Sequence, residues 1–142
     1  MDVDVNLCNF NLCSESPQGT AEGAGMGHTF YNHLFHIVFS TKDRMGLLED
    51  QNREQTHRYL CGTAKSCGCT ILAINSVADH VHLLVKIKPS MAVSEFVGKI
   101  KANSSRWIKE RFDLPYGFQW QVGFSSFTVS LSSAPNVKQY IE

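Results

Sequence analysis

Two histidines at alternate positions of one apolar segment are the residues with the clearest potential for chemistry. Residues 76–87 are rich in β-branched and apolar side chains and are followed by Pro89, a pattern that predicts a β-strand. Side chains alternate between the faces of a strand, so His80 and His82 share one face while Val81 and its apolar partners face the core. Two imidazoles on one face can each offer a nitrogen lone pair to a single cation. The spacing alone favours the plainer interpretation, two partly exposed histidines that bind nothing.

A tyrosine near the C-terminus is the second candidate for chemistry. Ser133 and Pro135 form a start signal for a short last helix, and Tyr140 lies on that helix. A tyrosine hydroxyl can act as a nucleophile when its surroundings activate it. A lone tyrosine in this position is more typical of a half-buried amphipathic side chain. Two histidines also leave a metal site incomplete, because catalytic sites generally take three or more protein ligands.

A basic helix follows the histidine strand. Ser90 is the predicted N-cap, and apolar or small residues recur at helical spacing to form one buried stripe, at Val93, Phe96, Val97, Ile100, Ser104, Trp107 and Ile108. Lys99, Lys101 and Arg106 lie among the basic residues of this helix, which outnumber the acidic ones. These three residues are candidates for binding nucleic acid. A phosphate-binding surface and an ordinary solvated helix face fit this charge pattern equally well.

The order of the predicted elements gives the fold class. A strand over 30–40, with His33 and His36 on opposite faces, precedes a helix over 48–65 in which Tyr59, Leu60 and Ala64 are buried. A strand over 69–75 leads into the histidine strand; the basic helix, an extended stretch over 118–130 and the last helix follow. Strands and helices in this order predict an α+β domain.

Length and composition limit the remaining possibilities. The 142 residues allow one domain with a real core, and no apolar run approaches the roughly 20 residues of a membrane helix. Residues 1–27 lack periodicity and hold four acidic and no basic residues, so the rest of the neutral chain has a net charge of +4. We predict that residues 1–27 are a disordered extension. The absence of a signal peptide and five irregularly spaced cysteines predict a cytoplasmic protein with reduced thiols.

Taken together, these features resemble a known family. From about Met26 to the end, the chain is similar to the HUH single-tyrosine transposases of small insertion sequences and to their REP-associated tyrosine transposase relatives. The order and spacing of several segments carry the resemblance, namely 28–31, 36–42, 79–84, 100–105, 120–124 and 137–141. No segment is specific by itself.

The resemblance implies a fold, a reaction and partners. The fold would be a ferredoxin- or RRM-like sandwich, with a central antiparallel sheet and helices packed mainly on one face. His80 and His82 would match the metal-binding histidines and Tyr140 the nucleophile, with Mg²⁺ or Mn²⁺ as the metal. The reaction would cleave and rejoin single-stranded DNA with hairpin ends through a 5′-phosphotyrosine, in a homodimer of a prokaryotic cytoplasm.

The sequence departs from the family pattern at one position, and two other functions are alternatives to a transposase. Family members carry a glutamine ligand four residues after the tyrosine, a position that lies beyond Glu142, where the sequence ends. We therefore expect residues 28–142 to be a C-terminally truncated domain with reduced or absent activity. A non-catalytic RRM-like module that binds single-stranded nucleic acid is the main alternative. A replication-initiator or relaxase-type nickase, which shares the chemistry, is the other.

Overall fold

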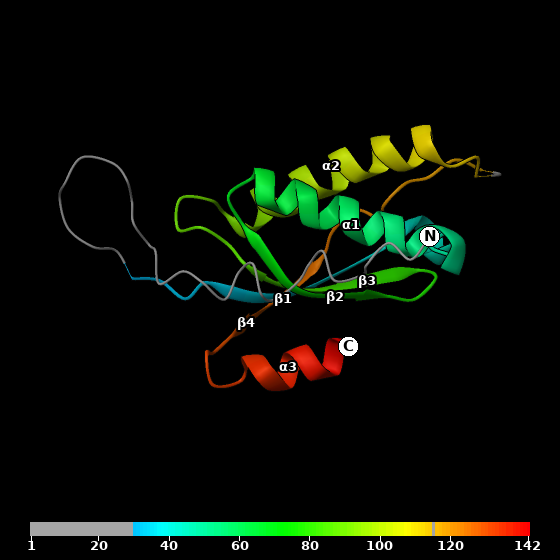
Figure 1. Cartoon of the computed structure of the whole chain (residues 1–142). Helices are drawn as coiled ribbons and strands as arrows, with labels where there is room; N and C mark the ends of the chain where they lie inside the picture. Colours follow the sequence, from blue (N-terminus) through cyan, green and yellow to red (C-terminus); the bar gives the residue numbers. More distant parts are fainter. Residues whose placement is uncertain (1–29, 115) are drawn as a thin grey trace.

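The computed structural model describes residues 30–114 and 116–142, so the predicted extension over residues 1–27 lies outside the described residues. Four strands and three α-helices make up this part of the chain, together with one short 3-10 helix (Figure 1). In chain order they are β1 (Leu34–Ser40), η2 (Lys42–Arg44), α1 (Asp50–Ser66), β2 (Thr70–Ser76), β3 (His80–Lys86), α2 (Val93–Arg111), β4 (Ser125–Val129) and α3 (Ala134–Ile141).

The strands form one antiparallel sheet in the order β2-β3-β1-β4. Helices α1 and α2 cover one face of the sheet, and α3 lies alone against the other face (Figure 1). The predicted α+β sandwich with helices mainly on one face is therefore confirmed. Strand β3, which carries the two histidines, lies between β2 and β1 in the interior of the sheet.

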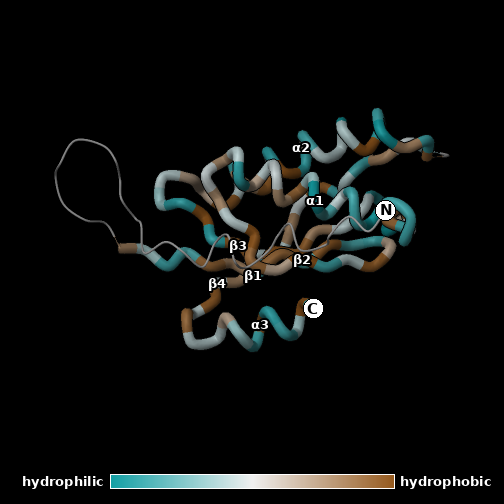
Figure 2. Tube along the Cα trace, in the orientation of Figure 1, coloured by the Kyte–Doolittle hydropathy of each residue, from teal (hydrophilic) through white to brown (hydrophobic). Residues whose placement is uncertain are grey.

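The main core fills the space between the sheet and the helices α1 and α2. Val81, Leu83 and Val85 are fully buried there, as the alternation along β3 predicts. Most of the predicted stripe of α2 is buried against them, whereas Val93 and Trp107 are only partly buried at its margin. Apolar residues accordingly concentrate along the strands and alternate with hydrophilic positions along the two helices (Figure 2).

A second, smaller core lies beneath α3. Leu84 is buried on the same side of β3 as the histidines because α3 covers it, and Ile141 of α3 is buried with it. Leu34, Ala73 and Val129 complete this cluster. Eight residues are too few for a helix to be stable in water by itself, so α3 depends on this contact.

Several predicted boundaries were wrong at strand ends. The first strand begins at Leu34 instead of residue 30, and the Phe30 side chain is almost fully exposed, without apolar contacts to hold a longer strand. The predicted strand over 76–87 is split by the hairpin turn, so Ser76 ends β2. The extended stretch over 118–130 forms a strand only from Ser125, because Trp120 makes no more than an isolated bridge to Thr41.

Two smaller predictions about side chains also differ from the structure. Ala92, not Ser90, is the N-cap of α2, because the main chain turns after Pro89 and buries Met91 before the helix begins. Tyr59 is partly exposed and stacks on Trp107, with ring centroids 4.6 Å apart, instead of entering the core.

The cysteines differ among themselves in their bonding. Cys67 and Cys69 are free thiols, as predicted, and Cys69 is buried at the start of β2. Cys61 is disulfide-bonded, so the prediction of reduced thiols is wrong for that residue. Across the described parts of the chain, no helix is long and apolar enough to cross a membrane.

Candidate active site

The two histidines of β3 lie side by side on the sheet face that α3 covers. The hairpin between β2 and β3 turns over residues 77–79 and delivers His80 as the first residue of β3. The ring centroids of His80 and His82 are 5.0 Å apart, and both side chains are partly exposed. The pairing of two imidazoles that the alternation predicts is therefore present.

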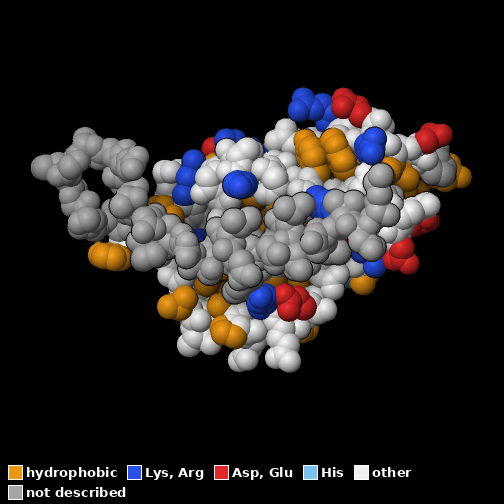
Figure 3. Space-filling model, in the orientation of Figure 1, with side chains coloured by type: hydrophobic (Ala, Val, Ile, Leu, Met, Phe, Trp, Pro, Cys, Tyr) orange, Lys and Arg blue, Asp and Glu red, His pale blue; other side chains and the backbone are white. Residues whose placement is uncertain are grey.

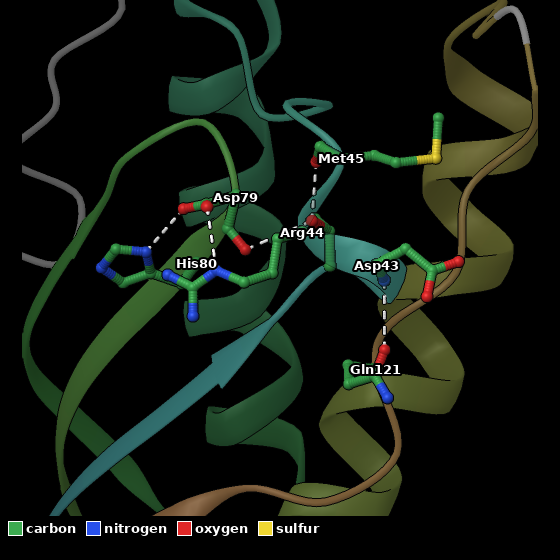
Figure 4. Close-up of polar contacts among 7 residues, drawn as sticks. Asp43, Arg44, Met45, Asp79, His80 and Gln121 are labelled. Carbon is green, nitrogen blue, oxygen red and sulfur yellow. Dashed lines mark hydrogen bonds and ion pairs between the residues drawn. The ribbon is translucent and has the colours of Figure 1, made fainter.

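Asp79 binds the first histidine and an arginine at the same time. Its Oδ1 atom lies 2.7 Å from His80 Nδ1, and its Oδ2 atom accepts a hydrogen bond of 3.1 Å from Arg44 Nε (Figure 4). The hydrogen bonds from His80 and then Arg44 lower the pKa of Asp79 below its usual value, so the group is a carboxylate at neutral pH. The Arg44 guanidinium remains largely exposed, with 66% of its side-chain surface accessible.

An unusual turn places Arg44 beside this carboxylate. Asp43 and Arg44 are consecutive non-glycine residues in the left-handed region, with φ of 54° and 53°, a conformation that costs free energy and persists only where neighbouring contacts hold it. Thr41 Oγ1 donates to the carbonyl of Met45 at 2.6 Å, and Gln121 Oε1 accepts from the Asp43 amide at 3.1 Å (Figure 4). These two hydrogen bonds stabilise the turn formed by Asp43 and Arg44 after the end of β1.

A third histidine joins the pair from the neighbouring strand. β1 runs antiparallel to β3 with Val38 opposite His82, so His36, two residues from Val38, is the diagonal neighbour of His82. His36 Nε2 lies 3.0 Å from His82 Nδ1, and the two rings stack with centroids 5.3 Å apart. Sequence reasoning did not select His36, although its alternation with the buried Ile37 was a signal that could have placed it on this face.

Burial sets the protonation state of His36 and His82. Desolvation lowers the pKa of His36 and, together with repulsion from His80 and His36, that of His82. Both rings are therefore neutral at neutral pH. A neutral imidazole retains a nitrogen lone pair, which is the form that binds a metal ion.

Tyr140 stands over these rings in the same chain. Its ring centroid lies 6.1 Å from those of His36 and His82, in an edge-on arrangement, and 73% of the residue is exposed. Two contacts hold the end of α3 in place: the buried Ile141 side chain, and a hydrogen bond of 2.9 Å from Asn75 Nδ2 to the Ile141 carbonyl. Because Asn75 lies opposite His82 in the β2-β3 register, the same pair of strands positions the histidine and the tyrosine helix.

A cleft of about 380 Å³ opens next to the histidines. Arg44, His80 and His82 line one part of it, and the segment 121–125 lines another. Phe124, on that segment, is 40% exposed. The cleft thus combines an accessible cation, an aromatic ring and the two imidazoles.

The three basic residues predicted to bind nucleic acid are not part of the histidine cluster. Their helix, α2, covers the opposite face of the sheet, where Lys99 pairs with Glu95 and Arg106 contacts Asn103. Lys101 reaches towards the cleft, but its ammonium group donates to the Gln121 carbonyl at 2.7 Å and to that of Gly123, so it stabilises the wall of the cleft. On the face drawn in Figure 3, Lys and Arg side chains are interspersed with Asp and Glu over the helical layer, without forming a single patch.

The donor atoms fit part of a metal site. Among residues 30–114 and 116–142, no group of three or more His, Cys, Asp or Glu side chains is placed to hold a metal ion. His80 and His82 offer two imidazole nitrogen donors, and oxygen ligands would have to complete the set. Nitrogen donors suit Mn²⁺ better than Mg²⁺, which prefers an all-oxygen shell. A divalent metal stays a prediction for this chain.

Comparison with known sequences identifies relatives over most of the chain. The family described as "Transposase IS200 like" matches residues 29–142. The transposase for insertion sequence element IS200 of Salmonella typhimurium is 32% identical over 122 residues, which cover 82% of this chain and 80% of that protein. The ISDra2 transposase TnpA of Deinococcus radiodurans is 27% identical over 125 residues, or 83% of this chain and 87% of that protein.

Solved structures agree with this result. A transposase candidate from Deinococcus radiodurans superposes with a TM-score of 0.68 at 27% identity, covering 84% of this chain and 95% of that chain. A REP-associated tyrosine transposase bound to a REP hairpin superposes with a TM-score of 0.60 over 84% of this chain and 70% of that chain; at 12% identity, it shows a shared fold. The resemblance drawn from the ordered segments is therefore confirmed, and the chain belongs to the family of IS200-like transposases.

Proposed function

We propose that this transposase cleaves and rejoins single-stranded DNA, with Tyr140 as the nucleophile beside a divalent cation held by His80 and His82. The position of the tyrosine ring over the histidine cluster of its own chain is the observation that carries the proposal. A tyrosine with only a packing role would be more buried than this one, which is 73% exposed.

The reaction uses the tyrosine as a temporary carrier of one DNA end. The Tyr140 hydroxyl loses its proton and attacks the scissile phosphorus, the P–O3′ bond breaks, and the departing oxygen takes up a proton as a free 3′-hydroxyl. The product is a 5′-phosphotyrosine, which preserves the energy of the phosphodiester. A 3′-hydroxyl from another strand end reverses the step and releases Tyr140, so rejoining requires no ATP.

The site residues have separate roles in this scheme. His80 and His82 would hold the cation, which when bound polarises the scissile phosphate and offsets the charge that develops on its oxygens. Asn75 and Ile141 keep α3 docked, so that the Tyr140 hydroxyl is delivered to the same place in each turnover. The partly exposed histidine rings leave room for an extended strand at the surface.

The cleft next to the histidines would receive the DNA strand. The exposed Arg44 guanidinium is suited to a backbone phosphate, and the exposed ring of Phe124 is suited to stacking on a base. A hairpin beside the cleavage site is supported by the structural neighbour that was solved with a REP hairpin. The substrate class is then single-stranded DNA that flanks a hairpin.

The test is the formation of a covalent adduct. Purified protein is incubated with Mn²⁺ and single-stranded DNA carrying the hairpin that flanks its gene; a 3′-end label follows the strand that becomes attached to protein. We expect an adduct with the unmodified chain, in the reduced amount that a ligand set of only His80 and His82 allows among the described residues. We expect none with Tyr140→Phe and a strong further reduction with His82→Ala. His33→Ala is the matched control, because His33 is exposed just before β1 and lies outside the cluster.

The competing function predicts a different set of results. A non-catalytic RRM-like module would bind the same DNA without metal, would retain that binding in His80→Ala, and would form no adduct under any condition. That outcome would overturn the proposed chemistry and leave DNA binding as the function.

We also propose that two copies associate through β4. This strand pairs with β1 on one side only, is the edge of the sheet, and exposes residues 125–128. An exposed edge accepts a strand from another chain, and a second copy offers the same edge. Thr128→Lys, which adds a charge to this edge, should convert dimers to monomers in analytical ultracentrifugation, whereas Val122→Lys, at an exposed position outside the strand, should not.

A further inference from the structure

In both His80 and His82, the Nδ1 atom lies within hydrogen-bonding distance of another side chain. His80 Nδ1 lies 2.7 Å from Asp79 Oδ1, and His82 Nδ1 lies 3.0 Å from His36 Nε2. The two partners differ in kind, because one is a carboxylate from the preceding residue and the other is an imidazole from a different strand. Nothing in the reaction described above assigns a role to His36.

The chemistry of imidazole limits what each contact can be. A neutral ring has one N–H and one lone pair, and a carboxylate can only accept a hydrogen bond. In its neutral form His80 therefore carries its proton on Nδ1, which leaves the lone pair on Nε2 for a cation.

The contact between the two imidazoles has two possible directions. If His36 Nε2–H were the donor, the lone pair of His82 would be occupied at Nδ1 and its Nε2 would carry the proton, so His82 could not bind a metal. If His82 Nδ1–H is the donor, its Nε2 lone pair remains available, as in His80. Only the second direction makes the two histidines of β3 equivalent as ligands.

We propose that His36 is a positioning residue that accepts a hydrogen bond from His82 Nδ1 and thereby holds His82 in the tautomer that binds the divalent cation through Nε2. The proposal rests on the metal-binding role proposed for His82. The stacking of the two rings at an interplanar angle of 27° supports a fixed orientation.

The location of His36 suits this role better than that of a third ligand. It lies on β1, hydrogen-bonded to β3 along seven paired positions, so its distance to His82 is set by rigid sheet structure. Among the described residues, no set of three potential ligand side chains meets the geometry of a metal site, although three histidines lie in this cluster. A neutral acceptor also leaves the positive charge of the cation less compensated than a carboxylate would.

The experiment compares three variants with the unmodified chain. His36→Gln places an amide oxygen where it can accept the same hydrogen bond, and His36→Leu removes the acceptor while retaining bulk. His33→Leu is the control, because His33 is exposed just before β1 and lies outside the cluster. Nitrogen-15 NMR of the imidazole groups, in metal-free protein at a pH well above the ordinary histidine pKa, reads the tautomer of His82 directly. Mn²⁺ affinity is then measured by the electron paramagnetic resonance signal of the free ion.

We expect His82 to carry its proton on Nδ1 in the unmodified protein, in His36→Gln and in His33→Leu, and to shift towards the Nε2–H form in His36→Leu. Mn²⁺ affinity should fall by about 10- to 100-fold in His36→Leu and be largely restored in His36→Gln. An Nε2 proton on His82 in the unmodified protein overturns the proposal, even if the leucine variant does not fold. So does an unchanged Mn²⁺ affinity in His36→Leu.

Failure of the proposed function would look different. If the unmodified chain binds no Mn²⁺, or binds it equally well in His82→Ala, the metal role of His82 is wrong, and the His36 proposal falls with it, whatever the tautomer. If His82→Ala abolishes Mn²⁺ binding while His36→Leu does not weaken it, the metal site stands and only the role of His36 is refuted.

Discussion

Removing the apolar anchor of the tyrosine helix should release that helix and leave the rest of the fold intact. Ile141 is 5% exposed and belongs to the small cluster beneath α3, which is separate from the main core under α1 and α2. Ile141→Ala therefore removes packing from a region where the contacts of α3 to the remainder of the chain are few.

The size of the effect follows from the buried groups that are lost. Replacing isoleucine by alanine deletes three carbon atoms, and each buried CH₂ contributes about 0.8 kcal/mol, so docking of α3 weakens by about 2.4 kcal/mol. That free energy corresponds to a factor of about 60 in the docking equilibrium. An eight-residue helix has little stability of its own, so the undocked segment should also lose its helical structure.

Native-state hydrogen exchange measures this directly. Amides of α3 should exchange up to about 60-fold faster in Ile141→Ala, while amides of β1, β3 and α2 keep their protection, because local opening of α3 does not require the main core to open. Formation of the DNA adduct should fall in parallel, since Tyr140 leaves the histidine cluster when α3 undocks. Leu131→Ala, a change of similar chemistry at a residue that is 70% exposed, is the control and should alter neither quantity.

Two results would refute this reasoning. Unchanged exchange in α3 would mean that the Asn75 hydrogen bond and the other α3 contacts are sufficient without Ile141. An equal acceleration in β1, β3 and α2 would mean that the two apolar clusters unfold as one cooperative unit.

Three further predictions concern residues around the site and its supports. His57 is hydrogen-bonded to Ser76 at 2.7 Å, and burial and Arg53 lower its pKa from the ordinary value of 6.5 to about 4. The unfolded chain therefore binds the proton more readily than the folded chain does. The contribution of His57 to the free energy of unfolding is complete above pH 6.5 and declines by up to about 3 kcal/mol as the pH falls to 4. His57→Gln should flatten this part of the profile of urea midpoint against pH, and an unaltered slope would contradict the assignment. Lys101→Met should lower the free energy of unfolding by about 1 kcal/mol and speed hydrogen exchange in residues 121–124, since it removes the donor to two carbonyls of that segment, whereas Lys99→Met should do neither. Trp120→Phe should lower the free energy of unfolding, measured in urea, by about 1–3 kcal/mol, because the buried indole N–H donates to Ser104 Oγ at 2.9 Å; a neutral result would show that the Ser104 hydroxyl needs no partner besides the Ile100 carbonyl.

The parts of the fold that depend on local spacing were predictable from the sequence. Alternation along β3 assigned Val81, Leu83 and Val85 to the core and His80 and His82 to the opposite face, and the structure confirms that division. Helical spacing likewise identified most of the buried stripe of α2. These signals work because backbone geometry repeats every two or 3.6 residues, whatever the remainder of the chain does. The ends of the elements were less predictable, since turns and tertiary contacts decide where a strand stops.

By itself, then, the sequence determined the α+β class, the transposase resemblance, and the presence of two neighbouring imidazoles and a tyrosine. The tertiary structure alone decided how these groups meet. Pairing of β1 with β3 brings His36 to His82 across 46 positions of the chain. Docking of α3 on the sheet face opposite α1 and α2 buries Leu84 and places Tyr140 next to the rings of His36 and His82. The physical reason is that strand order and helix docking depend on which surfaces bury one another across the whole domain. That is a global balance of free energy, and the local spacing of residues does not reveal it.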